Sequence, residues 1–186
     1  LGFQGQRNTY GDRLALLLQL HVTFADGAEE IITSDEAWRA ALGPIRASDL
    51  YNGEVYDARR ERSGWDRAGY LDRDWAGVRT LPAPTAALVA QNGPPVRPIE
   101  ELSARAITVS PEGETIVDFG QNLVGGVRIR MRGEAGQTVR LRHAEVLQPD
   151  GNLYTENLRS AQQTDEYTLK GDDEEVYEPT FTFHGF

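Results

Sequence analysis

The chain has 186 residues, of which 39% are hydrophobic and 26% are charged, and it contains no cysteine. A chain of this length buries roughly 70% of its unfolded surface, so a hydrophobic core can hold it without disulfides or a structural metal. The lack of cysteine excludes disulfides, thiolate zinc sites and cysteine nucleophiles. A net charge of −10 argues against binding to nucleic acid, and the longest apolar stretch, residues 14–18, is too short to span a membrane. We therefore expect a soluble protein with neither nucleic acid nor membrane as partner.

The charge is unevenly spread along the chain. Residues 1–98 carry 13 acidic and 11 basic side chains, whereas residues 99–186 carry 16 acidic and 8 basic ones. This shift coincides with a linker-like stretch in which five prolines lie between residues 82 and 98. Because proline ends helices and interrupts sheet ladders, we predict a domain boundary between about 80 and 98. The predicted domains are residues 1–90 and residues 91–186.

The residue pattern in the first half of the chain is typical of β-strands. The even positions from 14 to 24 are all apolar, and in the second half of this stretch polar residues alternate with them, which predicts a strand with one buried face. Residues 25–27 form a turn signal, and residues 30–33 are the predicted hairpin partner. Trp38 follows, and we interpret it as an anchor in a sandwich core.

The second half predicts strands at 107–109 and 115–119, joined by a turn at 111–113. In 127–132 and 139–142, arginines alternate with apolar residues on either side of a glycine turn. This pattern predicts a hairpin in which Met131 lies opposite Val139, because a slip of one residue would mix the faces. Arginines would then face one another, which is unfavourable. We expect carboxylates of this acidic half, or of a missing partner domain, to cover them. The alternative is a solvated face with ordinary ion pairs. The candidates within the chain are Glu156, Asp165, Glu166 and Glu178.

The remaining pattern completes an all-β fold. Residues 148–151 are a strong turn signal, residues 171–175 an acidic loop, and residues 180–184 alternate as a final strand. Helical periodicity is weak and short, the best example being residues 36–42. We predict two tandem antiparallel β-sandwiches of the jelly-roll type.

Six segments have amino-acid sequences that are more specific than strand alternation requires. In chain order they are Asn8–Arg13, Asp49–Arg59, Asp118–Asn122, Leu141–Leu147, Thr155–Arg159 and Phe181–Phe186. Together they resemble the bacterial α-L-rhamnosidases of glycoside hydrolase family 78 over essentially the whole chain. The resemblance implies that residues 1–90 are the C-terminal part of the family's N-terminal β-sandwich, truncated at its start. Residues 91–186 would be its concanavalin-like β-sandwich.

The resemblance also implies a role for the chain. Family members continue into an (α/α)6 barrel that carries the catalytic acids and hydrolyses terminal α-L-rhamnose by inversion, a mechanism that needs two carboxyl groups roughly 6.5–9.5 Å apart. No residue here matches the catalytic motif, so we assign no catalytic residue. We expect a non-catalytic accessory fragment whose partners are the (α/α)6 catalytic domain and a rhamnosylated glycan or glycoside. The parent would be a bacterial protein, cytoplasmic or secreted.

The richest polar cluster lies in residues 49–59. On an extended strand, alternate residues share a face, so polar side chains occupy both faces here, which is unusual in a plain sandwich. Such oxygens can hold a hard cation or hydrogen-bond to sugar hydroxyls, while a tyrosine packs against the sugar. The resemblance adds Ca²⁺ as a possible cofactor, since some family members carry calcium-dependent rhamnose-binding modules. The alternative is a buried structural network. The candidate carbohydrate-binding residues are Asp49, Asn52, Glu54, Tyr56, Asp57 and Arg59.

Two further features have a functional and a structural interpretation. Trp75, beside Asp72 and Asp74, is either a sugar platform or the closure of a sandwich end. His21, His143 and His184 show no ligand spacing, so the sequence predicts no metal site. For His143 and His184 the alternatives are a structural role and support for the catalytic barrel. A purely structural pair of sandwiches is the remaining alternative for the whole chain.

Overall fold

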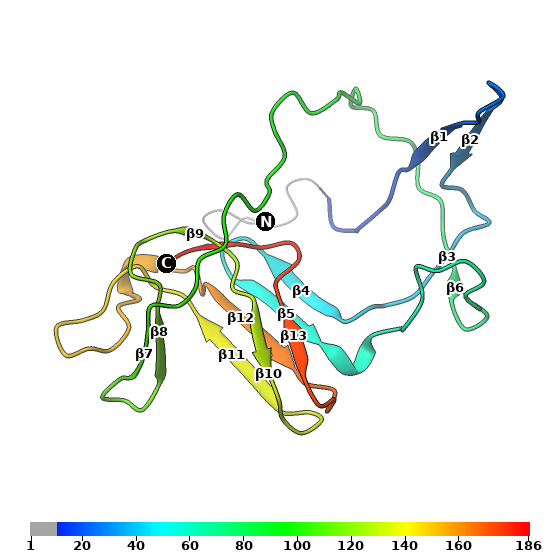
Figure 1. Cartoon of the computed structure of the whole chain (residues 1–186). Helices are drawn as coiled ribbons and strands as arrows, with labels where there is room; N and C mark the ends of the chain where they lie inside the picture. Colours follow the sequence, from blue (N-terminus) through cyan, green and yellow to red (C-terminus); the bar gives the residue numbers. More distant parts are fainter. Residues whose placement is uncertain (1–10) are drawn as a thin grey trace. The chain divides into compact units, whose positions relative to one another are not determined.

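The computed structural model describes residues 11–186 and is all-β, as the sequence predicts (Figure 1). Apart from two short 3-10 helices, η1 (Ala58–Arg60) and η2 (Glu156–Leu158), the regular elements in this range are strands. None of its helices is long and apolar enough to cross a membrane. The strands are β1 (Gln19–Thr23), β2 (Glu29–Thr33), β3 (Arg39–Ala40), β4 (Ile45–Asp49), β5 (Gly53–Asp57), β6 (Ala76–Gly77), β7 (Ala106–Val109), β8 (Thr115–Asp118), β9 (Val124–Gly125), β10 (Ile129–Met131), β11 (Thr138–Arg142), β12 (Thr164–Thr168), β13 (Glu175–Tyr177) and β14 (His184–Gly185).

The described chain forms two compact units, one of residues 11–42 and 62–93 and the other of residues 43–61 and 94–186. Residues 43–61 lie within the predicted first domain, yet they belong to the second unit because β5 pairs with β12. The predicted domain limits of 1–90 and 91–186 stay a prediction.

The first unit contains two small antiparallel sheets, β1–β2 and β3–β6. The predicted hairpin is present, with Val22 opposite Glu30 and a turn closed by the Phe24 N–H donating to the Ala28 carbonyl. Its predicted buried face is wrong: Leu20 remains 50% exposed, and no residue in the described part of this unit is fully buried. Two-stranded sheets of this kind are marginal on their own, because they have too little apolar surface to bury.

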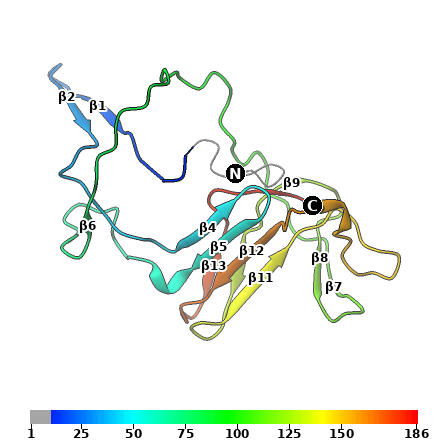
Figure 2. The ribbon, with the colours of Figure 1, turned by 180° about the vertical axis from the view of Figure 1, so that it is seen from behind.

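The second unit is built on a four-stranded sheet in the order β11-β12-β5-β4, whose strands lie side by side in Figure 2. The pairing of β5 with β12 is parallel, whereas β4–β5 and β11–β12 are antiparallel. The separate β10–β13 pair lies against this sheet, and side chains from both sheets form the core. The fully buried members are Ala58, Tyr167, Leu169 and Tyr177. Three tyrosine rings from β5, β12 and β13 contact one another there, with centroids 4.9–5.8 Å apart.

The predicted arginine hairpin is wrong. β10 pairs with β13, so that Met131 lies opposite Glu175, and β11 pairs with β12, so that Arg140 lies opposite Glu166. The two arginine strands thus belong to different sheets, and the repulsion that direct pairing would create is avoided.

Carboxylates lie beside the arginines, but the side chains of Arg128, Arg130 and Arg140 stay 49%, 71% and 63% exposed. The face therefore fits the alternative of a solvated face with ordinary ion pairs. Glu166 accepts from Arg140 at 2.8 Å and Glu178 from Arg128 at 2.7 Å, so two of the four candidates are ion-pair partners. Glu174, which the sequence analysis did not select, pairs with Arg130 at 3.4 Å. Acidic residues of the second unit therefore neutralise its own arginine rows.

A glycine permits a close approach between the start of β5 and the start of β12. Gly53 has φ +104°, and a Cβ atom there would lie 2.5 Å from the carbonyl carbon of Thr164 and closer still to its oxygen. The same Cβ would lie 2.9 Å from Oδ1 of Asp165. Only glycine fits this backbone conformation and this contact. The position brings β5 directly beside the buried side chain of Asp165.

Candidate functional site

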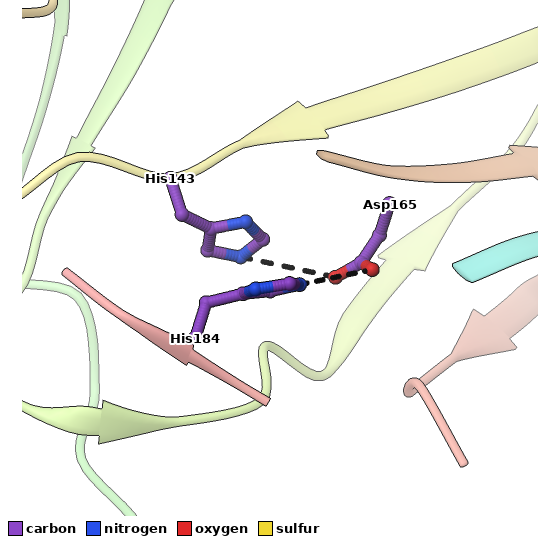
Figure 3. A group of neighbouring side chains, drawn as sticks. All are labelled: His143, Asp165 and His184. Carbon is purple, nitrogen blue, oxygen red and sulfur yellow. Dashed lines mark hydrogen bonds and ion pairs between the residues drawn. The ribbon is translucent and has the colours of Figure 1, made fainter. Parts of the chain in front are cut away.

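Three buried polar residues from distant segments meet in the second unit (Figure 3). His143 follows β11, Asp165 lies on β12, and His184 begins β14; their exposed fractions are 4%, 0% and 2%. One nitrogen or oxygen atom of each lies within 4.8 Å of the other two. We call these three residues the His–Asp–His cluster.

Backbone pairing places each member of the cluster. Along β12 the side chains alternate, so Asp165 and Tyr167 are buried while Glu166 turns toward Arg140. The N–H of His143 donates to the carbonyl of Gln163, which continues the β11–β12 ladder past Arg142. His184 lies opposite Gly125 in the β9–β14 pair, and this pairing fixes its approach to Asp165.

The carboxylate of Asp165 is the centre of the cluster. Its Oδ1 atom accepts from the backbone N–H of Glu54 at 2.8 Å and lies 3.2 Å from Nε2 of His184. The two imidazole rings lie 4.5 Å apart with a tilt of 34°, and the His143 ring also contacts Phe186 at 5.0 Å. The cluster is therefore enclosed by aromatic and backbone groups.

The other carboxylate oxygen of Asp165, Oδ2, faces Nε2 of His143, and no hydrogen bond joins the two atoms. The His143 Nδ1 atom lies 3.0 Å from the Gln163 carbonyl oxygen, so Nδ1 carries the proton and Nε2 carries a lone pair. This Nε2 atom lies 4.0 Å from Asp165 Oδ2. Both atoms are buried without a hydrogen-bond partner, and so is Nδ1 of His184. Buried polar atoms of this kind call for a partner.

Burial sets the protonation of the groups around the cluster. Desolvation lowers the pKa of His143, and the neighbouring His184 lowers it further, although the Gln163 carbonyl and Asp165 oppose the shift. His143 is therefore a neutral imidazole at pH 7. Desolvation raises the pKa of Glu54, which is also fully buried. The Glu54 carboxylate accepts from the hydroxyl of Tyr177 at 3.3 Å and from the Thr180 N–H at 3.2 Å.

The predicted carbohydrate-binding residues lie on and beside β4 and β5, where most have internal partners. Asp49 accepts from the backbone N–H groups of Tyr51 and Asn52 at 2.9 and 3.1 Å, and thereby shapes the β4–β5 turn. Burial raises the pKa of Asp49, but these two hydrogen bonds lower it, and the net shift is downward. The carbonyl of Asn52 accepts from the Thr164 N–H at 3.0 Å.

The other three candidates make contacts near η1. The Tyr56 hydroxyl donates to Glu61 at 3.0 Å, and its ring stacks on Tyr167. Asp57 caps η1 and binds the Arg59 guanidinium at 2.8 Å, an ion pair that lowers the pKa of Asp57. Carbohydrate or calcium binding by the six residues stays a prediction. Their observed contacts, including the burial of Glu54, fit the alternative structural network.

Trp75 is also engaged within the first unit. Its ring packs edge-on against Tyr70 at 5.8 Å, and the Arg62 guanidinium lies 5.9 Å from its centroid. Arg62 in turn binds Asp74 at 2.6 Å. These contacts fit closure of a loop, and the sugar platform stays a prediction.

The sequence pattern does not reveal the His–Asp–His cluster. His143 and His184 are 41 positions apart, so no ligand spacing links them. One signal was available: Asp165 shares a face of its alternating strand with Tyr167 and Leu169, and a carboxylate on an apolar face requires a specific partner. The partner is identified only by the pairing of β9 with β14, which brings His184 to Asp165. Strands of two residues leave no pattern in the sequence that would predict this pairing.

Comparisons with known proteins agree with this fold. Residues 1–100 match the domain family described as the alpha-L-rhamnosidase N-terminal domain, and residues 108–186 match the bacterial alpha-L-rhamnosidase concanavalin-like domain. An alpha-L-rhamnosidase of Streptomyces avermitilis is 57% identical over 95% of this chain and 17% of its own length. One from Formosa agariphila is 38% identical over 92% of this chain and 19% of its own length.

Solved structures give the same result. The crystal structure of the Streptomyces avermitilis enzyme complexed with L-rhamnose matches with a TM-score of 0.90 at 57% identity, over 95% of this chain and 17% of that one. That of the Aspergillus terreus enzyme matches with a TM-score of 0.93 at 44% identity, over all of this chain and 22% of that one. The chain thus spans about a fifth of the length of these relatives. It belongs to the α-L-rhamnosidase family, of which it carries the N-terminal and concanavalin-like domains.

Proposed function

We propose that this chain is a non-catalytic part of an α-L-rhamnosidase that hydrolyses terminal α-L-rhamnose by inversion, and that it supports an (α/α)6 catalytic domain. One observation carries the proposal. The two family domains follow one another over residues 1–100 and 108–186, while relatives bearing the enzyme's name are about five times longer. The substrate is a rhamnosylated glycan or glycoside.

The carboxylates of the second unit support a non-catalytic role. An inverting glycosidase needs a general acid and a general base that both reach the sugar, separated by room for a water molecule. Glu54 and Asp165 have exposed fractions of 0%, so neither can reach a substrate. Several more exposed acids are held by arginines, as Glu166 is by Arg140 and Glu178 by Arg128.

The packed core of the second unit is consistent with a role in holding the catalytic domain. Tyrosines from three strands and Leu169 fill the space between the two sheets of the second unit. Close-packed cores transmit force with little deformation, so such a unit can hold a neighbouring domain in a fixed position. We expect the second unit to provide this rigid support.

A chimera tests the proposal. The segment of the Streptomyces avermitilis enzyme that aligns with this chain is replaced by residues 1–186, and hydrolysis of a chromogenic α-L-rhamnoside is measured. Because the two segments are 57% identical, we expect the chimera to retain activity within about tenfold of the parent. The isolated chain is expected to show no turnover.

Two controls sharpen the experiment. Deleting the segment is expected to abolish activity, and a chimera that carries the Gly53→Asp substitution is expected to lose it through misfolding of the β5–β12 contact. Saturable turnover by the isolated chain, or a folded chimera without activity, would contradict the proposal.

A further inference from the structure

The His–Asp–His cluster contains a buried carboxyl group that has no lysine or arginine as a partner within residues 11–186. Asp165 and Glu54 are both fully buried, and the N–H of Glu54 donates to the Asp165 carboxylate. Within residues 11–186, the ion pairs of Asp165 are those with His143 and His184, and no lysine or arginine joins them. A buried carboxylate is stable when it is paired with a cation or coordinates a metal.

The free atoms of the cluster point at one another. Nε2 of His143 and Oδ2 of Asp165 are both electron-pair donors, they lie 4.0 Å apart, and neither has a hydrogen-bond partner. Two facing acceptors need a hydrogen-bond donor or a cation between them. The Gln163 carbonyl fixes the His143 tautomer in the way that backbone carbonyls fix ligating histidines in metal sites.

We propose that His143, Asp165 and His184 bind one divalent transition-metal ion, for which Zn²⁺ is the best fit. Two imidazoles and one carboxylate form a donor set that suits zinc, whereas calcium takes oxygen ligands. The ion would join β11, β12 and β14 at the point where their side chains meet. This structural role goes beyond the proposed function and does not depend on it.

The geometry is close to what zinc requires. Tetrahedral bonds of about 2.0–2.2 Å place ligand atoms roughly 3.3–3.6 Å apart. His184 Nε2 lies 3.2 Å from Asp165 Oδ1 and His143 Nε2 lies 4.0 Å from Asp165 Oδ2, so the two rings approach different oxygens of the carboxylate. One atom of each residue lies within 4.8 Å of the other two, and the set must close by about 1 Å to reach the tetrahedral spacing. Because the cluster is buried, the ion would enter while the chain folds.

The test is refolding of the 186-residue chain from urea with Zn²⁺ or with a chelator, followed by gel filtration and measurement of bound metal. We expect one zinc per chain and a higher melting temperature in the zinc sample. Refolding with Co²⁺ is expected to give the visible absorption bands of a tetrahedral site. Less than about 0.1 zinc per chain, or no difference in melting temperature, would overturn the proposal.

Three variants make the test specific. Asp165→Asn supplies an amide that can donate to His143 Nε2, so it is expected to fold well and to lose the bound zinc. His143→Asn keeps a donor for the Gln163 carbonyl but removes Nε2, and is expected to weaken zinc binding by about a hundredfold. His21→Ala removes the one remaining histidine, which is exposed, and is expected to bind zinc like the parent.

The variants also separate the metal from its competitors. A buried water or a shared proton would satisfy the same atoms, and in that case the parent would refold equally well with the chelator. If Asp165→Asn does not fold, the zinc contents of His143→Asn and His21→Ala still show whether the ion binds at the cluster. Equal zinc content in those two variants would show that the ion binds elsewhere and would overturn the proposal.

Discussion

Substituting Gly53 by alanine probes the contact between β5 and β12. The backbone conformation at φ +104° costs an alanine about 1–2 kcal/mol. Its Cβ atom would overlap the backbone of Thr164, so the two strands must separate locally. That separation weakens the hydrogen bond from the Thr164 N–H to the Asn52 carbonyl, which contributes about 1 kcal/mol.

The same separation acts on the Asp165 carboxylate. The hydrogen bond from the Glu54 N–H to Asp165, at 2.8 Å, is charge-assisted and contributes about 1.5–3 kcal/mol. Together with the backbone cost, we expect Gly53→Ala to lower the free energy of unfolding by about 3.5–6 kcal/mol. For a chain of this size the melting temperature should fall by roughly 7–24 °C.

Gly113→Ala is the matched control for this prediction. Gly113 lies in the β7–β8 turn of the same unit with φ +84°, and a Cβ atom there would meet nothing within 4 Å. Gly113→Ala should therefore lower the free energy of unfolding only by the cost of the backbone conformation, about 1–2 kcal/mol. Urea unfolding followed by tyrosine fluorescence measures both variants, because the core tyrosines lie in the second unit whereas Trp38, Trp65 and Trp75 lie in the first. A loss in Gly53→Ala equal to that in Gly113→Ala would refute the argument from close approach.

Two further predictions concern charged side chains. Burial raises the pKa of Glu175, but hydrogen bonds from backbone N–H groups, among them that of Gly171, and from the Tyr167 hydroxyl lower it more, so the net shift is downward. A lowered pKa stabilises the folded state above the ordinary value of 4.5, and this stability disappears as the pH falls through the folded-state value. Glu175→Gln should therefore lose about 1–3 kcal/mol at pH 7 and progressively less below pH 4.5, as measured by urea unfolding across pH; a loss independent of pH would contradict this. Arg140→Ala should lose less than about 1 kcal/mol, because its ion pair with Glu166 is largely exposed, and a loss above about 2 kcal/mol in the same assay would contradict it.

Strand periodicity predicted much of the fold because it is local. The hairpins β1–β2 and β7–β8 lie where alternation and turn residues indicated them. The arginine strands show the limit: local alternation gave the correct faces of β10 and β11, but their partners lie in β13 and β12. Pairing between distant strands depends on side chains that no short window contains.

The candidate site shows the same limit more strongly. The sequence drew attention to residues 49–59 because polar residues occupy both faces of one segment, and the structure explains that density by capping, turn and core contacts. The His–Asp–His cluster instead assembles from single residues on three elements. Each of them is unremarkable in its own segment, and only the tertiary fold gives them a common position.

The parallel pairing of β5 with β12 has a consequence for biosynthesis. The Glu54 N–H and the Asp165 carboxylate that it contacts are 111 positions apart. At about 5–20 residues per second, a ribosome needs roughly 6–22 s to reach β12 after it has made β5. During that interval the β4–β5 hairpin has an unpaired edge and an unburied Glu54. We therefore expect the second unit to fold late in synthesis, and a nascent chain stopped before residue 160 to depend on a chaperone.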